Sequence, residues 1–176
     1  WNLTGQHNVY NACAAIAAAR HVGVPPAMAI QGLNEFEGVK RRMERLIDLP
    51  RLKLYDDFAH HPTAIKMTLD GLRKQVGSEK IIAIVEPRSN TMRMGIHTQT
   101  LAESLDKADI ALIYQPENMD WDLSELRNYA DNITICTSLD SIVNQLKQHA
   151  DKHCHFVLMS NGSFGGIYQR LVNEFS

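Results

Sequence analysis

The sequence has few of the features that mark membrane, secreted or nucleic-acid-binding proteins. No apolar run approaches the roughly 20 residues that a membrane-spanning helix requires, and the first residues lack the charged and apolar regions of a signal peptide. The formal net charge is only −2, from 18 basic and 20 acidic residues, so the chain has no basic stripe to offset nucleic-acid phosphates. We therefore expect neither a membrane nor a nucleic acid as a partner.

Cysteine is also scarce, and several catalytic motifs are missing. Cys13, Cys136 and Cys154 are an odd number, lie in apolar helix or strand patterns and show no CxxC spacing. They indicate neither a disulfide framework nor a structural zinc site, and they favour a reducing cytoplasm. The sequence has no GxGxxG fingerprint, no P-loop lysine, no nucleophile elbow and no recognisable metal-ligand cluster. The missing fingerprint argues against a dinucleotide-binding domain.

Short apolar stretches alternate with amphipathic stretches along most of the chain. With 44% hydrophobic residues, its 176 residues are enough for one core and a small appendage. The apolar stretches include IIAIV at 81–85, IALIY at 110–114 and HFVLM at 155–159. Strands that are apolar throughout and separated by helices are typical of a parallel sheet covered on both faces. We predict an α/β fold, a Rossmann-like three-layer domain with a mostly parallel sheet.

The beginning of the chain has a different pattern. Residues 7–21 are rich in alanine and predict a helix whose small side chains let another backbone come close, and a second helix is expected over 26–34. Three basic residues at 40–42 then form either a solvated turn or an anion clamp. We expect a short helical segment at 1–34 and one main domain at 35–176. Because the chain begins without a methionine, we interpret it as a piece of a longer protein.

The polar residues of the chain are concentrated in loops at one edge of the predicted sheet. Right-handed crossovers place the loops at 56–62, 86–95, 115–121 and 160–166 along the same edge. Open α/β sheets bind their ligands in the crevice at this edge. We therefore expect the most polar of these loops to converge on one crevice.

The stretch YDDFAHHPT at 55–63 follows a buried strand and opens a helix. The backbone N–H groups of the first helical turn favour anions, and Asp56 and Asp57 could hold a cation or the proton donors of a substrate. Alternatively, the aspartates orient the turn, and His60 and His61 are solvated loop residues. These residues by themselves leave both interpretations open.

Arginine and carboxamide side chains supply further candidates. Arg88 and Arg93 follow the IIAIV strand, where two guanidinium groups suit a ligand that bears carboxylates, although a solvated loop is the alternative. The glycine-containing loop at 160–166 is a weak phosphate motif, and contact with a peptide backbone is the better interpretation. Asn8 and Asn11 share one helix face, where they either bind a nucleotide or cap the helix.

The chain contains, in this order, GQHNVYNACAA (5–15), FEGVKRR (36–42), YDDFAHHPT (55–63), EPRSNTMR (86–93) and SNGSFGG (160–166). Together these motifs resemble the C-terminal part of the Mur ligases, the ATP-dependent amide-bond-forming enzymes of peptidoglycan synthesis. DDFAHHPT resembles the branch that adds to UDP-N-acetylmuramate itself. Within that branch, EPRSNTMR and MSNGSFGGIY are more similar to the peptidoglycan-recycling ligases than to the L-alanine-adding ligases, which are expected to carry a histidine and an arginine where this chain has Arg88 and Ser89.

The resemblance implies a three-domain enzyme of the bacterial cytoplasm. An N-terminal domain holds the UDP-sugar, a central P-loop domain holds ATP and Mg²⁺, and a C-terminal domain brings the amine acceptor. The muramate carboxylate is phosphorylated to an acyl phosphate, which the acceptor's amine attacks. The implied acceptor is the tripeptide L-Ala-γ-D-Glu-meso-diaminopimelate, with L-alanine as the alternative. Residues 1–34 then correspond to the tail of the central domain, and residues 35–176 to the acceptor-binding domain.

The resemblance also implies roles for individual residues. Asn8 and Asn11 match nucleotide-contacting asparagines, and Arg42 and Asp57 match an arginine and an aspartate that the family brings to the ATP site on domain closure, as catalytic residues. For the acceptor we predict Arg88, Ser89, Asn90, Arg93, Ser160 and Asn161, together with His60 and His61. A tripeptide with several carboxylates gives both arginines a function, whereas a single alanine needs only one.

The sequence lacks the P-loop GKT segment, the magnesium ligands and the UDP-sugar domain, so these 176 residues are expected to be inactive by themselves. Two hypotheses from other classes remain open. The chain could be a free-standing Rossmann-like module that binds a nucleotide or a small peptide. It could also be an interaction domain that docks through the alanine-rich helix at 7–21, whose apolar face would then be expected to self-associate.

Overall fold

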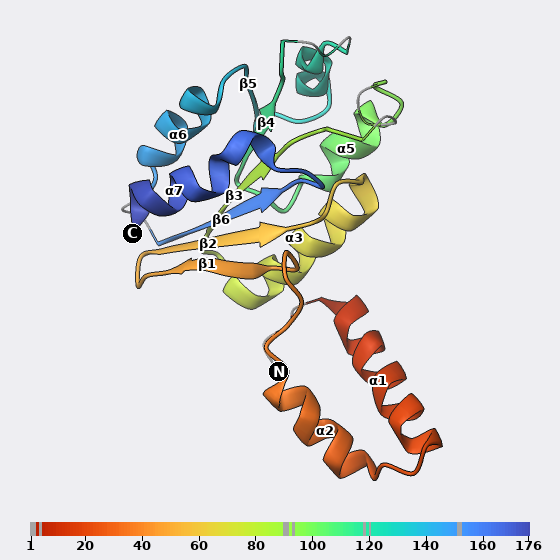
Figure 1. Cartoon of the computed structure of the whole chain (residues 1–176). Coiled ribbons are helices and arrows are strands. Elements are labelled where there is room, and N and C mark those ends of the chain that lie inside the picture. Colours follow the sequence, from red (N-terminus) through yellow and green to blue (C-terminus); the bar gives the residue numbers. More distant parts are fainter. Residues whose placement is uncertain are drawn as a thin grey trace.

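The computed structural model describes residues 3, 5–89, 92, 94–117, 119, 121–150 and 153–176. Within them a helical hairpin precedes a six-stranded sheet that carries helices on both faces (Figure 1). The helices are α1 (Gln6–His21), α2 (Pro26–Glu35), α3 (Pro62–Val76), α5 (Thr98–Ser104), α6 (Leu139–Lys147) and α7 (Ile167–Phe175), with 3₁₀ helices η1 (Leu123–Asn128) and η2 (Phe164–Gly166). The strands are β1 (Glu44–Asp48), β2 (Leu52–Asp57), β3 (Lys80–Val85), β4 (Ile110–Tyr114), β5 (Ile133–Cys136) and β6 (Cys154–Met159). The predicted α/β fold class is confirmed.

The strand order β1-β2-β6-β3-β4-β5 places the last strand in the middle of the sheet. β1 runs antiparallel to β2, and every other described pair is parallel. β6 pairs with β2 on one side and with β3 on the other, so that Met159 lies opposite both Asp57 and Val85. The loop after β6 therefore lies between the loop after β2 and the loop after β3, at the edge where parallel α/β sheets bind ligands.

Two apolar cores, one on each face of the sheet, hold the three layers together. Side chains alternate along β3, so that Ile81, Ala83 and Val85 pack with α3 and α5, whereas Ile82 and Ile84 pack with α6 and α7. All five side chains are inaccessible to solvent. Each buried isoleucine contributes roughly 2 kcal/mol relative to an exposed one. This rigid frame positions the loops that follow β2, β3 and β6.

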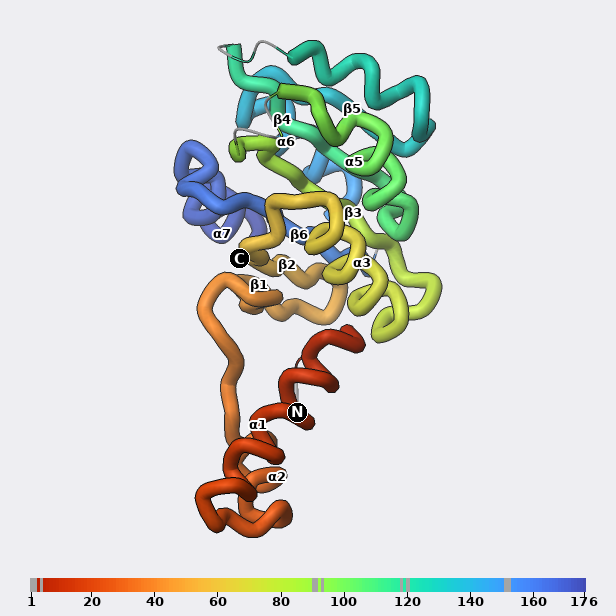
Figure 2. The backbone as a smooth tube through the Cα atoms, turned by 90° about the vertical axis from the view of Figure 1, so that its right-hand side faces the viewer, coloured from red at the N-terminus to blue at the C-terminus, as the bar shows by residue number. Residues whose placement is uncertain are grey.

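The helical hairpin of α1 and α2 extends away from the sheet beyond the β1 edge (Figure 2). The two helices pack on each other, α1 also contacts α3, and neither helix contains a buried residue. Large apolar side chains such as Tyr10, Met28 and Ile30 are about half or more exposed, at 66%, 63% and 49%. The hairpin of α1 and α2 thus presents an uncovered apolar surface in the described part of the chain. No described helix is both long and apolar enough to cross a bilayer.

At the amino end of β6, the buried side chains of Tyr55 and His155 form a line of polar contacts that ends at the exposed carboxylate of Glu79. His155 is 3% exposed, its Nδ1 lies 3.2 Å from the Tyr55 hydroxyl oxygen, and its Nε2 lies 2.7 Å from Glu79 Oε2. This hydrogen bond holds the pKa of Glu79 below its usual range. A carboxylate with a lowered pKa in the folded state stabilises the fold above its ordinary pKa, and this stabilisation is lost as the pH falls through the lowered value.

Replacement of Glu79 by glutamine is therefore expected to lower the temperature of thermal unfolding at pH 7. In acid, where Glu79 of the unmodified chain is itself protonated, the difference between the two proteins should disappear. Circular dichroism melts at a series of pH values would measure this difference. Glu125→Gln on the exposed face of η1 is the matched control. A Glu79→Gln difference that stays constant from neutral to acid pH would contradict the assigned hydrogen bond.

Candidate functional site

The first candidate site, which we call the hairpin pocket, lies between α1, the turn before β1 and the end of β2. It has a volume of about 320 Å³ and is lined by Leu3, His7, Asn8, Asn11, Val39, Arg42, Met43, Asp57 and Thr68. Four residues singled out from the sequence, Asn8, Asn11, Arg42 and Asp57, thus lie around one pocket. They come from segments that are far apart in the sequence, and the fold brings them together.

Asp57 forms the floor of the hairpin pocket. The carboxylate is 4% exposed and accepts hydrogen bonds from the backbone N–H groups of Met43, at 2.9 Å, and Ala59, at 2.8 Å, and from the Thr68 hydroxyl at 3.3 Å. Burial raises the pKa of Asp57, and these hydrogen bonds oppose the rise. The side chain thereby fixes the turn before β1 against the end of β2.

The two asparagines form the opposite wall of the hairpin pocket. Asn11 Nδ2 lies 3.5 Å from Asn8 Oδ1, as expected for residues on one helix face. The capping alternative is wrong, because Gly5 occupies the N-cap of α1 and no side chain caps it. His7, one residue earlier, has a buried Nδ1 without a hydrogen-bond partner among the described residues. Carboxamides and an unsatisfied imidazole nitrogen can exchange hydrogen bonds with a heterocyclic base or a sugar hydroxyl.

In the basic run before β1, the side chains of Arg41 and Arg42 have different surroundings. Arg42 is exposed and lines the hairpin pocket, where its guanidinium carbon lies 5.7 Å from the centroid of the Phe58 ring. Arg41 points the other way and forms an ion pair with Asp56, with its Nε 3.1 Å from Oδ2. For Arg41, neither the solvated turn nor the anion clamp expected from the sequence is correct, because its charge is used inside the protein.

The second candidate site, which we call the edge pocket, lies at the carboxyl ends of β3 and β4 beside the loop after β6. It has a volume of about 350 Å³ and is lined by Glu86, Pro87, Arg88, Tyr114, Pro116, Met119, Ser163 and Gly165. Arg88 lies so close to Gly162 that a Cβ atom there would be 1.6 Å from Arg88 Nη1. A side chain at this position would therefore displace the Arg88 guanidinium. A guanidinium, a carboxylate and apolar walls suit a ligand with charged groups on an aliphatic chain.

Ser160, the first residue after β6, links this loop by hydrogen bonds to a residue that lines the edge pocket. It is completely buried, its hydroxyl donates to Glu86 Oε2 at 2.5 Å, and the Gly162 N–H donates to the same hydroxyl oxygen at 2.9 Å. Ser160 thus shapes the loop rather than facing solvent. Asn161 has a buried Oδ1 without a hydrogen-bond partner in the described part of the chain. Ser89, in the loop after β3, is half-buried.

Four further residues were predicted from the sequence to bind the acceptor. Asn90 and Arg93 lie outside the described residues. His60 Nδ1 lies 2.9 Å from the Phe58 carbonyl oxygen, and the His61 ring packs edge-on against His97, with 4.8 Å between their centroids. The histidines therefore lie outside the set of residues that lines the edge pocket.

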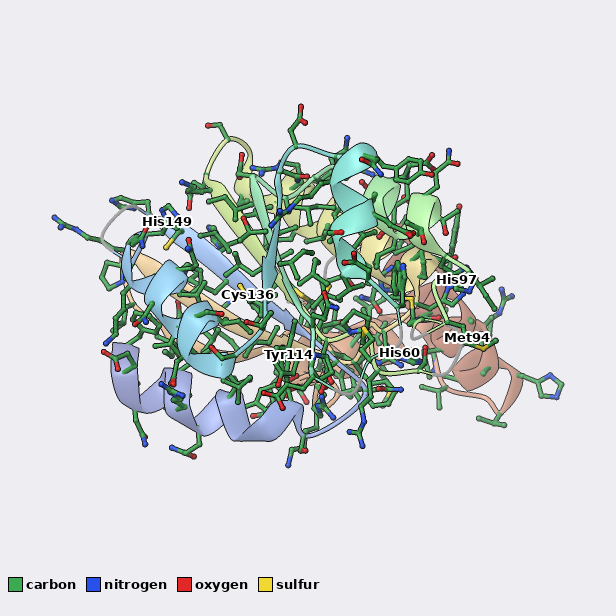
Figure 3. The ribbon with its side chains drawn as sticks, turned by 90° about the horizontal axis from the view of Figure 1, so that it is seen from above. His60, Met94, His97, Tyr114, Cys136 and His149 are labelled. Carbon is green, nitrogen blue, oxygen red and sulfur yellow. The ribbon has the colours of Figure 1, made fainter. Side chains whose placement is uncertain are left out.

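Three residues that the sequence did not single out also lie near this edge. Tyr114 and Met119 line the edge pocket, and His97 lies at the start of α5. In Figure 3, His60 and His97 lie in the right-hand half of the view and His149 lies on the left. Tyr114 could have been found from the sequence, because it is the last residue of an apolar strand and so lies at the ligand-binding edge.

With two pockets at the carboxyl edge of a mostly parallel sheet, the chain can be compared with known families. The model of the family described as Mur ligase, glutamate ligase domain, matches residues 41–162, and the chain therefore belongs to the Mur ligase family. The UDP-N-acetylmuramate–L-alanyl-γ-D-glutamyl-meso-2,6-diaminoheptandioate ligase of Haemophilus influenzae is 43% identical over 176 residues. That alignment covers 99% of this chain and 39% of the relative, so the chain spans about two-fifths of the length of this ligase.

Two solved structures are similar to this chain. The crystal structure of a murein peptide ligase from Psychrobacter arcticus has 44% sequence identity and a TM-score of 0.74, over 99% of this chain and 38% of that one. A domain of a putative UDP-N-acetylmuramate:L-alanyl-γ-D-glutamyl-diaminopimelate ligase from Haemophilus ducreyi has 38% identity and a TM-score of 0.64, over 77% of this chain and 100% of that one. The whole of that second chain aligns with this one.

The residues present fit part of a nucleotide better than they fit a metal ion. The hairpin pocket offers carboxamides for a base or sugar and the Arg42 guanidinium for a phosphate. Within the described residues, no group of three or more His, Cys, Asp or Glu side chains is arranged to hold a metal ion.

Proposed function

We propose that this chain is the C-terminal part of an ATP-dependent ligase that joins L-Ala-γ-D-Glu-meso-diaminopimelate to UDP-N-acetylmuramate during peptidoglycan recycling. The observation that carries this proposal is the 43% identity to a ligase of this kind along 99% of the chain. The presence of a nucleotide-compatible pocket and a separate edge pocket on one domain supports it. A reducing bacterial cytoplasm is part of the proposal, because the three cysteines of the sequence show no CxxC spacing and no disulfide framework.

The proposed division of the chain assigns residues 1–34 to the central ATP-binding domain and residues 35–176 to the acceptor-binding domain. The exposed apolar side chains of α1 and α2 support this division, because a surface of this kind is normally covered by another part of a protein. The solved Haemophilus ducreyi domain, which aligns with 77% of this chain, also supports it. The N-terminal and central domains of the same enzyme would then be the partners of this chain.

In the proposed reaction, ATP and Mg²⁺, held mainly by the central domain, would activate the muramate carboxylate as an acyl phosphate. The residues of this chain would supply orientation and electrostatics. Arg42 would place positive charge beside the phosphates, and Asp57 would hold the turn that carries Arg42. In the edge pocket, Arg88 would bind a carboxylate of the acceptor, and Glu86 lies where it can accept a hydrogen bond from an ammonium group.

A ligation assay of the complete enzyme tests this proposal directly. We expect ATP-dependent phosphate release that requires both UDP-N-acetylmuramate and the tripeptide, with L-alanine as a poor acceptor. Residues 1–176 by themselves should show no ligation. Equal rates with L-alanine would favour the L-alanine-adding ligase instead. ATP binding without ligation of either acceptor would favour a nucleotide-binding module.

Replacement of Arg88 by methionine should mainly weaken acceptor binding. Removal of a guanidinium that binds a carboxylate is expected to raise the KM for the tripeptide by about 30-fold, within the 1.5–3 kcal/mol of a charged hydrogen bond. The KM for ATP should change little, because Arg88 lies in the edge pocket and not in the hairpin pocket. Initial rates at varied tripeptide and ATP concentrations measure both constants. Arg127→Met, on the exposed surface of η1, is the control, and an unchanged tripeptide KM in Arg88→Met would contradict the assignment.

A further inference from the structure

Arg41 lies between the two pockets and contacts the segments that shape them. Its Nε lies 3.1 Å from Asp56 Oδ2, and its Nη2 donates to the Ser160 carbonyl at 2.7 Å and to the Tyr168 hydroxyl at 2.8 Å. Its guanidinium carbon lies 5.3 Å from the centroids of both the Phe58 and the Tyr168 rings. One side chain therefore joins the turn before β1, the end of β2, the loop after β6 and α7.

The backbone of Arg41 is held as firmly as its side chain. Its φ of 58° lies in the left-handed region that residues other than glycine rarely adopt. Its N–H donates to Glu44 Oε2 at 2.8 Å, and its carbonyl accepts from the Phe58 N–H at 2.8 Å. A residue keeps such a conformation when its surroundings over-determine it. The turn therefore has one defined position relative to β2.

The same turn reaches the hairpin pocket on its other side. Arg42 lines that pocket, and the N–H of Met43 donates to Asp57 Oδ2 at 2.9 Å. At the far end of the Arg41 side chain, Ser160 is bonded to Glu86 in the wall of the edge pocket. Arg41 itself is not among the residues that line either pocket. A shift of the loop after β6 can therefore reach the turn of the hairpin pocket through Arg41, beside the direct hydrogen bond from the Ser160 N–H to the Asp57 carbonyl at 3.2 Å.

We propose that Arg41 is a positioning residue that couples the edge pocket to the hairpin pocket by fixing the loop after β6 against the turn before β1. The inference rests on the proposed ligase function, in which acceptor and nucleotide occupy these two pockets together. Arg41 lines neither pocket, and its role is exerted through Ser160 and Arg42. Its role is to hold the acceptor's amine and the nucleotide in the correct positions relative to each other.

Variants of the complete enzyme test this coupling. Arg41→Met removes all three polar contacts. Arg41→Lys keeps a positive charge beside Asp56 and is therefore less prone to misfold. A single ammonium group cannot, however, replace the planar guanidinium, which donates to several acceptors at once. Arg170→Met, which breaks an exposed ion pair with Asp140 on the surface of α7, is the control. Three quantities are measured: the KM for the tripeptide, the affinity for ATP without acceptor, and amide hydrogen exchange of residues 160–166.

Both Arg41 variants are expected to raise the tripeptide KM about tenfold, a typical size for coupling between two sites, while ATP affinity without acceptor stays within about twofold of the unmodified enzyme. Exchange at 160–166 should become faster in both variants and not in Arg170→Met. An equal loss of ATP affinity without acceptor, or unchanged KM and exchange, overturns the inference. If the unmodified enzyme does not ligate the tripeptide, the proposed function fails, and the exchange comparison still decides whether Arg41 fixes the loop.

Discussion

Replacement of Arg42 by methionine is expected to lower kcat/KM of the complete enzyme by about 10³-fold, the size of effect seen when one preorganised charged or hydrogen-bonding group is removed from an active site. Arg42 is exposed at the rim of the hairpin pocket, and its guanidinium lies over the Phe58 ring. Its charge is thus available to a ligand. The loss should appear mainly in kcat if Arg42 interacts with charge that develops during phosphate transfer.

The fold should tolerate this change, because Arg42 is exposed and the buried Asp57 carboxylate, whose charge Arg42 favours, keeps its hydrogen bonds from Met43, Ala59 and Thr68. Thermal unfolding of the variant should therefore match that of the unmodified enzyme. Arg45→Met is the matched control, since Arg45 lies three residues further along and forms an exposed ion pair with Asp48. The assignment of Arg42 to the nucleotide would be wrong if kcat/KM stayed within a few-fold of its original value, or if Arg45→Met lost as much activity.

Replacement of Asp57 by alanine should destabilise the 176-residue chain by about 3 kcal/mol, because it leaves buried donors without an acceptor. The donors are the N–H groups of Met43 and Ala59 and the Thr68 hydroxyl. Urea unfolding followed by circular dichroism would measure the change in the free energy of unfolding. Asp106→Ala, which removes an exposed carboxylate paired with Lys107, should change it by less than about 1 kcal/mol.

The pH dependence of the same variant gives a second readout. Burial raises the pKa of Asp57 in the folded protein above the usual value of about 3.9. Between the ordinary and the raised pKa, the folded state binds more protons than the unfolded state, so the free energy of unfolding decreases as the pH rises through this window. Asp57→Ala should lack this part of the decrease. An identical pH slope in both proteins would show that Asp57 is not responsible for it.

The elements of this fold could be predicted from local sequence patterns, whereas their arrangement could not. The apolar stretch at 81–85 reads as a buried strand because both of its faces are covered, and it forms β3. The antiparallel direction of β1 and the insertion of β6 between β2 and β3 depend on contacts between distant segments. Periodicity carries no information about such pairings, so the sequence predicts a mostly parallel sheet without its strand order.

For the candidate site, too, the arrangement of the residues could not be predicted from local sequence patterns. That Asn8, Arg42 and Asp57 surround one pocket could be expected only from the family resemblance, because they come from a helix, a turn and a strand end that no local pattern connects. Arg41 and Arg42 are indistinguishable as neighbours in a basic run. In the structure Arg41 has a positive φ and its side chain pairs with Asp56, whereas the Arg42 side chain is exposed. Backbone conformation of this kind is set by the surrounding structure.

The central position of β6 has a consequence for how the protein is made. Its residues, 154–159, leave the ribosome after those of every other described strand, yet β2 and β3 both need them as a hydrogen-bonding partner. Until then the nascent chain carries two unpaired inner strand edges, which favour slow folding and association with other chains. Ser160, which bonds to Asp57 and Glu86, follows directly. The edge pocket, which Ser163 and Gly165 line, is therefore completed only after β6 has been made, whereas all the residues that line the hairpin pocket come earlier in the chain.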